Sequence, residues 1–215
     1  MKTATLIEAL VADRATRGKR VARWMALGLA GALAAGALAS LALFLVALGV
    51  RADIAEALVT WRFELKVAMV LLALGLAFSL CVSWSRPVTT GRAAWRLLPL
   101  AALAIAAVAI ELAALPGAAW VARLVGSNAV ICLTAIPALA MAPLAAVLWM
   151  LRSGAPASPA LAGAAAGLLA ATAGATLYAF HCFDDSPLFV ITWYGLAALP
   201  VIALGAIVGR RVLRW

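Results

Sequence analysis

The sequence is poor in the side chains that enzymes use for acid–base catalysis. Its 215 residues include one histidine, and Asp and Glu together number eight. It contains no P-loop, no HExxH pair, no Ser/His/Asp set and no glycine-rich dinucleotide fingerprint. So few proton donors and acceptors leave little for general acid–base chemistry. We therefore expect a protein that is not an enzyme.

Polar stretches long enough to form a soluble domain are also missing. Hydrophobic residues make up 67% of the chain, and the mean hydropathy is +1.12, which a soluble domain of this size cannot bury. The strict alternation of β-barrel strands is absent. Six apolar runs instead approach the length of about 20 residues that crosses a bilayer as a helix. These runs cover about 25–49, 66–84, 97–115, 129–151, 159–180 and 188–209.

The predicted fold is therefore all-α, a polytopic membrane protein with six transmembrane helices. Residues 1–24 form a cytoplasmic amphipathic and basic segment, residues 25–209 the transmembrane domain, and residues 210–215 a short basic tail. The first apolar run is longer than the h-region of a signal peptide, which has about 7–15 residues. We expect it to be an uncleaved first span.

Positive charge exceeds negative charge by nine. In a soluble protein such a bias suggests nucleic acid, but in a membrane protein it sets the orientation. The N-terminal segment and the connections on its side of the membrane hold 13 Lys and Arg, and the other connections hold 4. The positive-inside rule therefore predicts that both termini are cytoplasmic, and we expect no direct contact with nucleic acid.

The first 13 residues, MKTATLIEALVAD, are predicted to form an amphipathic helix. Thr5 and Glu8 match the S/T-x-x-E capping box. Four apolar side chains share one face of this helix: Leu6, Ile7, Leu10 and Val11. A helix this short is marginal alone in water. It either lies on the lipid surface or docks on a cytoplasmic protein.

One polar break, between the fifth and sixth runs, concentrates most of the remaining chemistry. In the stretch LYAFHCFDDSPLFVITWYG it brings together His181, Cys182, Asp184, Asp185 and Pro187. The charge count places this break on the outer side. Its acids and proline also suit the first turn of the sixth helix, where negative charge complements the helix dipole.

Two of the three cysteines are expected at the outer face. Cys132 lies within a turn of the outer end of the fourth span, Cys182 lies in the break, and Cys81 lies near the cytoplasmic end of the second span. The outer pair can form a static disulfide, stay inert, or act as a reactive dithiol. A protonated His181 would lower the pKa of the Cys182 thiol. With His181 and Asp184 or Asp185, the two thiols could also ligate Zn²⁺, Cd²⁺ or a similar thiophilic metal.

Glu111 is the one acid well inside a span. It falls at a depth similar to Cys132, so it either faces the same outer cluster or snorkels to the interface. A competing interpretation of the chain is a small transporter or permease component with Glu111 and His181 on its transport path. Intramembrane charge is sparse for that function, and no internal repeat is evident.

Two GxxxG patterns occur, at Gly163 and Gly167 and at Gly205 and Gly209. Small residues at this spacing let two helix backbones approach closely. In a chain so rich in alanine they are either such a contact or chance matches.

Several stretches of the chain resemble the NrsF family. They are the opening MKTATLIEALVAD, the Leu-Pro that follows Glu111, the terminal GRRVLRW and, most specifically, HCFDDSPLFVITWYG at residues 181–195. The resemblance implies a multi-pass anti-sigma factor of the bacterial inner membrane. Such a protein holds a cytoplasmic extracytoplasmic-function (ECF) sigma factor of the sigma-F type until envelope or metal stress releases it.

The resemblance also implies that Cys132 and Cys182 form a sensing pair on the periplasmic side. No cofactor is required, and a thiophilic metal ion would act as a signal. In the resulting hypothesis, the apolar face of the N-terminal helix docks on the sigma factor. Oxidation or metal capture at the two cysteines then shifts the fourth helix against the fifth and sixth.

Overall fold

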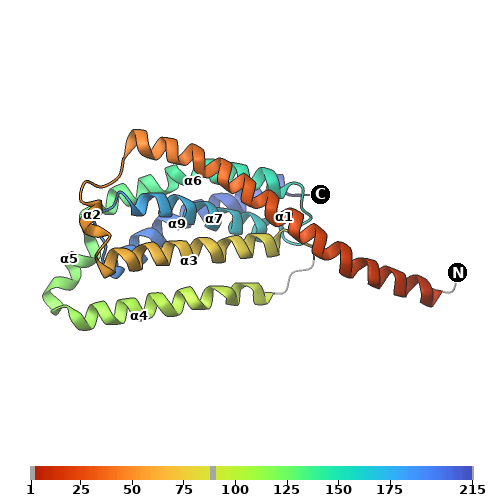
Figure 1. Ribbon diagram of the computed structural model, residues 1–215, viewed down its shortest axis with the longest axis horizontal. Helices are drawn as coiled ribbons and strands as arrows, with labels where there is room; N and C mark the ends of the chain where they lie inside the picture. The colour runs from red at the N-terminus through yellow and green to blue at the C-terminus, as the bar shows by residue number, and fades with distance from the viewer. Residues whose placement is uncertain (1–2, 88–90, 215) are drawn as a thin grey trace.

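The computed structural model describes the backbone of residues 3–87 and 91–214, and within these the side chains of residues 18, 20–87 and 93–214. Helices account for almost all of this part of the chain, which contains no strand (Figure 1). The long helices are α1 (Thr3–Ala47), α3 (Trp61–Trp84), α4 (Leu98–Ala114), α6 (Ala129–Leu151), α7 (Pro159–Ala179) and α9 (Gly195–Val212). Six helical stretches are long and apolar enough to span a membrane, which confirms the predicted fold.

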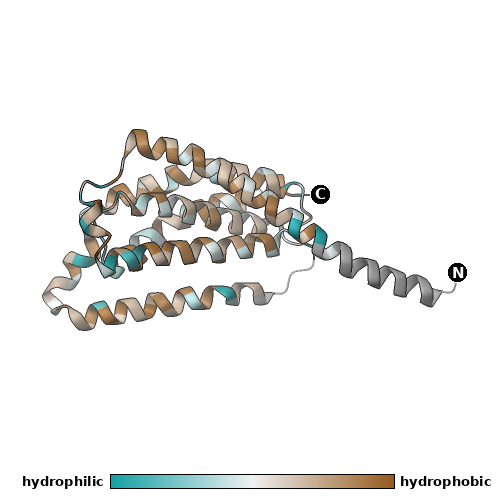
Figure 2. Ribbon diagram, in the orientation of Figure 1, coloured by the Kyte–Doolittle hydropathy of each residue, from teal (hydrophilic) through white to brown (hydrophobic). Residues whose placement is uncertain are grey.

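The helix boundaries follow the apolar runs, with two instructive differences. α1 is one continuous helix, so the amphipathic segment and the first span share a single axis. α3 begins at Trp61 rather than at the predicted 66, because charged residues occupy its first two turns. A prediction from hydropathy alone starts the span after those charges, whereas the helix already includes them. Figure 2 shows the corresponding polar band at one end of the bundle.

Short helices cap the bundle at the end opposite the termini. α2 (Ile54–Ala57) lies in the connection between α1 and α3, and α5 (Trp120–Val125) follows the single turn η2 (Gly117–Ala119). The sixth span opens with α8 (Pro187–Phe189) and a π-turn, η3 (Val190–Tyr194), before α9 begins. At the other end, η1 (Gly91–Leu97) precedes α4.

α7 is the central helix of the bundle. It packs against α9, α6 and α3, and about two thirds of its span (67%) is buried. α4 lies at the edge beside α3 (Figure 1), and only 11% of its span is buried. The helices therefore pack closely around α7, except for α4, which is loosely attached.

The two GxxxG patterns meet across the interface between α7 and α9. A Cβ added at Gly163 would stand 2.1 Å from the carbonyl oxygen of Gly205, and one added at Gly205 would stand 2.3 Å from that of Gly163. Gly167 lies against the Val201 backbone and Gly209 against Pro159 in the same way. The patterns are a real contact surface, because only hydrogen at these positions lets the two backbones approach.

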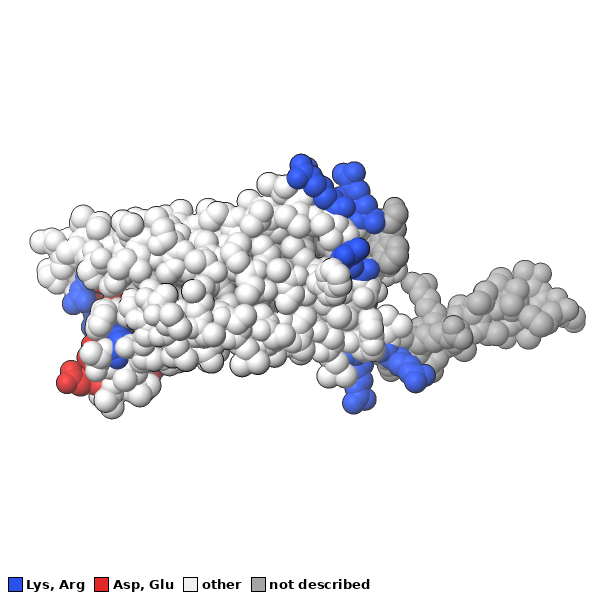
Figure 3. All heavy atoms as spheres, turned by 90° about the horizontal axis from the view of Figure 1, so that it is seen from above, with Lys and Arg blue, Asp and Glu red and all other residues white. Residues whose placement is uncertain are grey.

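Charge is divided between the two ends of the bundle (Figure 3). The end that carries the C-terminus and the entry of α1 displays only arginines among its described charged side chains: Arg20, Arg23, Arg86, Arg96, Arg152, Arg210, Arg211 and Arg214. Red atoms of acids appear at the opposite end, together with a few blue ones (Figure 3). The segments at that end carry all the described acids, Asp53, Glu56, Glu64, Glu111, Asp184 and Asp185, and also Arg51, Arg62, Lys66 and Arg123. The polar break predicted to be functional lies at this acidic end.

Candidate functional site

The break between α7 and α8 is held in place by two buried cations. Arg51, which follows α1, and Lys66, in the second turn of α3, both donate hydrogen bonds to the carbonyl oxygen of Cys182, at 3.1 and 2.8 Å. Both also form ion pairs with Asp185, Arg51 at 2.9 Å. Lys66 is 1% exposed and Arg51 is 7% exposed. One carboxylate and one backbone carbonyl therefore anchor three segments that are distant in the sequence.

Arg51 has further partners that fix its guanidinium. Asp53 accepts two hydrogen bonds from it, each at 2.7 Å, and the Phe183 ring lies 4.9 Å from its central carbon. The hydrogen bonds that Arg51 donates to Asp53, and then those it donates to Asp185, raise the pKa of Arg51, and Arg51 in turn lowers the pKa of Asp53. Arg51 and Asp53 therefore both stay charged at neutral pH.

Backbone contacts join the same two segments. The Arg51 amide donates to the Phe180 carbonyl at 3.0 Å, and Nδ1 of His181 lies 3.0 Å from the Gly49 carbonyl oxygen. Gly49 has a φ of +73°, a left-handed conformation that glycine adopts readily after a helix. The chain leaving α1 is thus hydrogen-bonded along its length to the break that contains Cys182.

Asp184 serves a different helix from the one predicted. Its carboxylate accepts the backbone N–H groups of Ser127 and Asn128 at 2.9 and 2.8 Å, directly before α6. Free N–H groups and the helix dipole make this position favourable for an anion. The prediction that both acids of the break sit at the start of the sixth helix is therefore wrong. Asp184 supports α6, and Asp185 neutralises the two cations.

Glu111 faces this end of the bundle and does not snorkel. Its side chain is 0% exposed. It accepts hydrogen bonds from Arg62 at 3.1 Å and from the Ser186 hydroxyl at 3.2 Å. This ion pair links α4 to α3 and to the break, so the intramembrane acid that a transport path would use is already paired.

The two outer cysteines lie in one buried cluster. Cys132 and Cys182 are free thiols with 0% exposure, packed among apolar residues and the rings of Tyr178 and Tyr194. The Cys182 thiol donates to the Asp184 carbonyl at 3.7 Å. Burial raises the pKa of Cys182, so the expectation that His181 lowers it is wrong. Cys81 is buried in the other core cluster, near the opposite end of the bundle.

The candidate metal ligands are not gathered around one point. Among the residues with described side chains, no three His, Cys, Asp or Glu groups come together as a metal site. Asp184, Asp185 and His181 each have the separate partners given above. The four apolar residues expected to dock a partner lie outside the described side chains: Leu6, Ile7, Leu10 and Val11.

Sequence reasoning missed the cations of this site. Arg51, Arg62 and Lys66 were counted only as charges of an outer connection. One signal pointed to Lys66, which directly precedes an apolar span, because a charge at membrane depth needs a partner. Its partner, Asp185, lies 119 residues further along the chain. No local sequence pattern identifies it.

Comparison with known proteins adds an independent finding. The family described as "NrsF: Negative regulator of sigma F" matches residues 10–215. The "Anti-sigma-F factor NrsF" of Caulobacter vibrioides (strain NA1000 / CB15N) is 37% identical over 218 residues, covering 100% of both chains. The "Probable anti-sigma-F factor NrsF" of Azospira oryzae (strain ATCC BAA-33 / DSM 13638 / PS) is 40% identical over 84 residues, 39% of each chain. No solved structure matches.

Proposed function

This chain belongs to the NrsF family of negative regulators of sigma F, and we propose that it sequesters an ECF sigma factor of the sigma-F type at the bacterial inner membrane. Family membership makes it a regulatory protein rather than an enzyme. The sigma factor is bound on the cytoplasmic side and is released when a periplasmic signal reaches the thiols at the acidic end. The separation of charge between the two ends supports this orientation, with both termini inside.

The docking element is the N-terminal part of α1. Leu6, Ile7, Leu10 and Val11 recur at the spacing of one helix face, which suits a hydrophobic groove on the sigma factor. Docking there would cover a surface that the sigma factor needs for RNA polymerase.

Deletion of residues 2–13 tests the docking element. In cells that carry a reporter gene for the cognate sigma factor, the deletion should raise transcription to the level seen without this protein. The deleted protein must still be present in the membrane fraction. Unchanged repression by a membrane-inserted deletion variant would contradict this assignment. If the protein were a transporter, its flux would survive the deletion.

The signal is proposed to act on Cys132 and Cys182. Both thiols belong to one buried cluster at the outer end, the side that meets an oxidising compartment in this orientation. Hydrogen peroxide would convert the two thiols into one disulfide, and would itself be reduced to two water molecules. Because both side chains are fully buried, the reagent reaches them when the break opens locally.

One observation supports the route to the cytoplasm. Arg51 and Lys66 both donate hydrogen bonds to the carbonyl oxygen of Cys182. A change in the position of Cys182 would therefore move these two side chains. Arg51 lies in the short segment that follows α1, and α1 runs as one helix from Thr3 to Ala47. We infer that modification of Cys182 shifts the outer end of α1 and thereby the docking element. This route adds to the predicted shift of the fourth helix against the fifth and sixth.

Serine variants test the sensing proposal against a matched control. Cys132→Ser, Cys182→Ser and the double variant should repress the reporter normally but lose induction by peroxide or by Cd²⁺. Cys81→Ser, a buried thiol in the other core cluster, should keep it. Induction that survives in all four variants excludes thiol sensing. Loss of the peroxide response alone assigns the Cd²⁺ response to other groups.

A further inference from the structure

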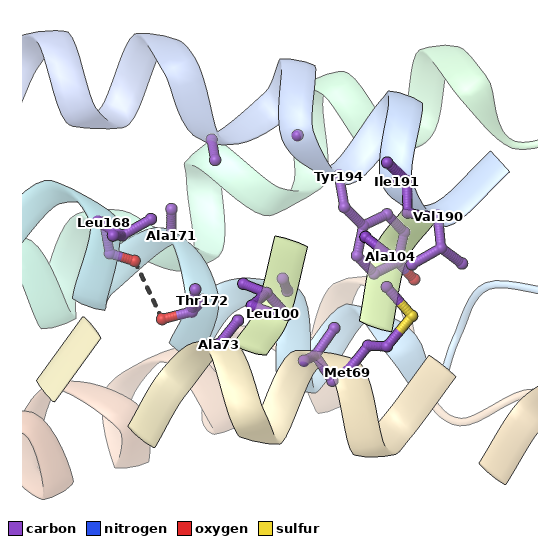
Figure 4. Close-up of a pocket in the computed structure, with 14 residues that line it drawn as sticks. Met69, Ala73, Leu100, Ala104, Leu168, Ala171, Thr172, Val190, Ile191 and Tyr194 are labelled. Carbon is purple, nitrogen blue, oxygen red and sulfur yellow. Dashed lines mark hydrogen bonds between the residues drawn. The ribbon is translucent and has the colours of Figure 1, made fainter. Parts of the chain in front are cut away.

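A second feature of the fold is an apolar cavity between α3, α4, α7 and the start of the sixth span. Its volume is about 210 Å³. Met69 and Ala73 line it from α3, Ala104 from α4, Thr172 from α7, and Val190 and Tyr194 from the π-turn (Figure 4). None of the groups that anchor the break to α1 takes part in it. The cavity is therefore separate from the charged site.

Tyr194 brings one polar atom into this apolar space. The residue is 6% exposed. Its buried hydroxyl lies beside the Cys182 thiol, a weak acceptor, and has no hydrogen-bond partner of good geometry among the described residues. Figure 4 shows its ring extending from the π-turn toward Met69 of α3. The other hydroxyl of the lining, that of Thr172, is satisfied by the Leu168 carbonyl at 3.0 Å. Leaving a buried donor without an acceptor destabilises the protein.

The π-turn explains why the tyrosine points inward. Residues Val190–Tyr194 form a π-helix in a span that is otherwise α-helical. A π-turn is rare and is often found at functional sites, because it rotates the following side chains relative to an α-helix. Here the turn itself provides Val190, Ile191 and Tyr194 to the cavity wall.

The size and position of the cavity indicate the kind of ligand. An apolar cavity of about 150 Å³ binds benzene, so a space of about 210 Å³ fits a single substituted ring. α4 forms one wall and is the least buried of the six candidate spans, so in a bilayer lipid would lie against this wall. A neutral phenol donates a hydrogen bond, and a carbonyl oxygen is an acceptor that an otherwise apolar molecule can carry.

We propose that this cavity binds a membrane-dissolved apolar molecule whose carbonyl oxygen accepts a hydrogen bond from Tyr194. A quinone ring and the ester group of a phospholipid both carry this chemistry. The binding site goes beyond the proposed regulation and does not depend on it. Its occupant would pack against the cluster that contains Cys182, since Val190 and Tyr194 belong to that cluster as well.

Binding is measured on the purified full-length chain in nanodiscs of defined phospholipid. The probes are a short-chain benzoquinone and an alkylbenzene of similar size that lacks carbonyls, each titrated by native mass spectrometry. The wild-type protein should bind the quinone roughly three- to tenfold more tightly than the alkylbenzene, as one hydrogen bond predicts. Phospholipid retained after delipidation, in place of either probe, identifies the ester as the acceptor.

Three variants distinguish the effect of the Tyr194 hydroxyl from the effect of the cavity volume. Tyr194→Phe keeps the ring and should remove the preference for the carbonyl compound, while leaving thermal stability unchanged or higher. Thr172→Val removes a hydroxyl that is already satisfied within α7, and should keep the preference. Ala104→Phe fills the cavity from α4 and should abolish binding of both probes.

Two results would overturn the proposal. One is equal preference for the quinone, or equal retention of phospholipid, in the wild-type protein and in Tyr194→Phe. The other is a loss of thermal stability in Tyr194→Phe, which would mean that the hydroxyl has a partner within the protein. Reporter repression by Tyr194→Phe is measured separately, so failure of this proposal is distinguishable from failure of the anti-sigma function.

Discussion

At the scale of single residues, Asp185 is the group on which the acidic end depends most. It is the carboxylate shared by Arg51 and Lys66, whose side chains are 5% and 0% exposed. Burying two cations is costly, and only a well-placed anion with additional acceptors offsets that cost. The Cys182 carbonyl and Asp53 provide those acceptors.

Asp185→Asn should therefore destabilise the protein strongly. It leaves Lys66 without an anionic partner, and loss of one member of a buried ion pair costs about 3–5 kcal/mol. The measurement is thermal unfolding of the purified protein in detergent. Asp53→Asn is the matched control, because Asp53 is more exposed and pairs only with Arg51. Equal losses in the two variants would contradict the shared role of Asp185.

The Cys182 thiol gives a second prediction at this scale. Burial raises its pKa, so the thiol is protonated at neutral pH and the reactive thiolate forms only at higher pH. In a Cys81→Ser, Cys132→Ser background, a maleimide should label folded protein slowly at pH 7 and faster as the pH rises. Mass spectrometry of folded and denatured samples gives the two rates. Labelling of folded protein as fast as the denatured chain at pH 7 would contradict a buried thiol.

At the scale of helices, the fold depends on how closely α7 approaches its neighbours. Its glycines bring it against α9, and Gly174 brings it against the Ile136 carbonyl of α6, where an added Cβ would stand at 2.8 Å. Without a hydrophobic driving force inside the bilayer, such close backbone contact is a main source of helix association.

Gly205→Leu should break the contact between α7 and α9. The added side chain would collide with the Gly163 backbone, and overpacking of this kind costs about 1–3 kcal/mol or more. Gly75→Leu is the control, because nothing lies within 4 Å of a Cβ at Gly75 in α3. Thermal unfolding should show a loss for the first variant alone. A comparable loss for Gly75→Leu would point to a general effect of glycine replacement.

At the scale of the whole molecule, charge distribution is the property that sets orientation. The end with the C-terminus carries arginines (Figure 3). The opposite end carries the described acids and four cations, of which Arg51, Arg62 and Lys66 form ion pairs with Asp185 or Glu111. The positive-inside rule predicts that the arginine-rich end lies in the cytoplasm.

Reporter fusions test this orientation. Alkaline phosphatase, which is active only in an oxidising compartment, should be active when fused after Thr60 and inactive when fused after Gly154 or Arg214. A fluorescent protein fused after Arg214 should give the reciprocal result. Activity after Gly154 would invert the topology, and the thiol cluster would then face the cytoplasm.

The sequence by itself determined the spans and the family. Apolar runs of membrane length left no alternative to transmembrane helices, and α6 begins and ends at the predicted 129 and 151. The glycine spacing showed where backbones could approach, and the motif at 181–195 pointed to the family that the comparison confirms. These features are local, since each depends on neighbouring residues and the bilayer.

Only the tertiary structure decided which groups meet. Asp184 and Asp185 are adjacent in the sequence, yet one supports α6 and the other pairs with Arg51, 134 residues away. The partner of Glu111 and the unpaired hydroxyl of Tyr194 were equally hidden. Buried polar groups take their partners from whichever helices pack beside them, so no local pattern specifies the pairing. Helix packing brings the break at Cys182 and Asp185 into hydrogen bonds and an ion pair with Arg51, which follows α1.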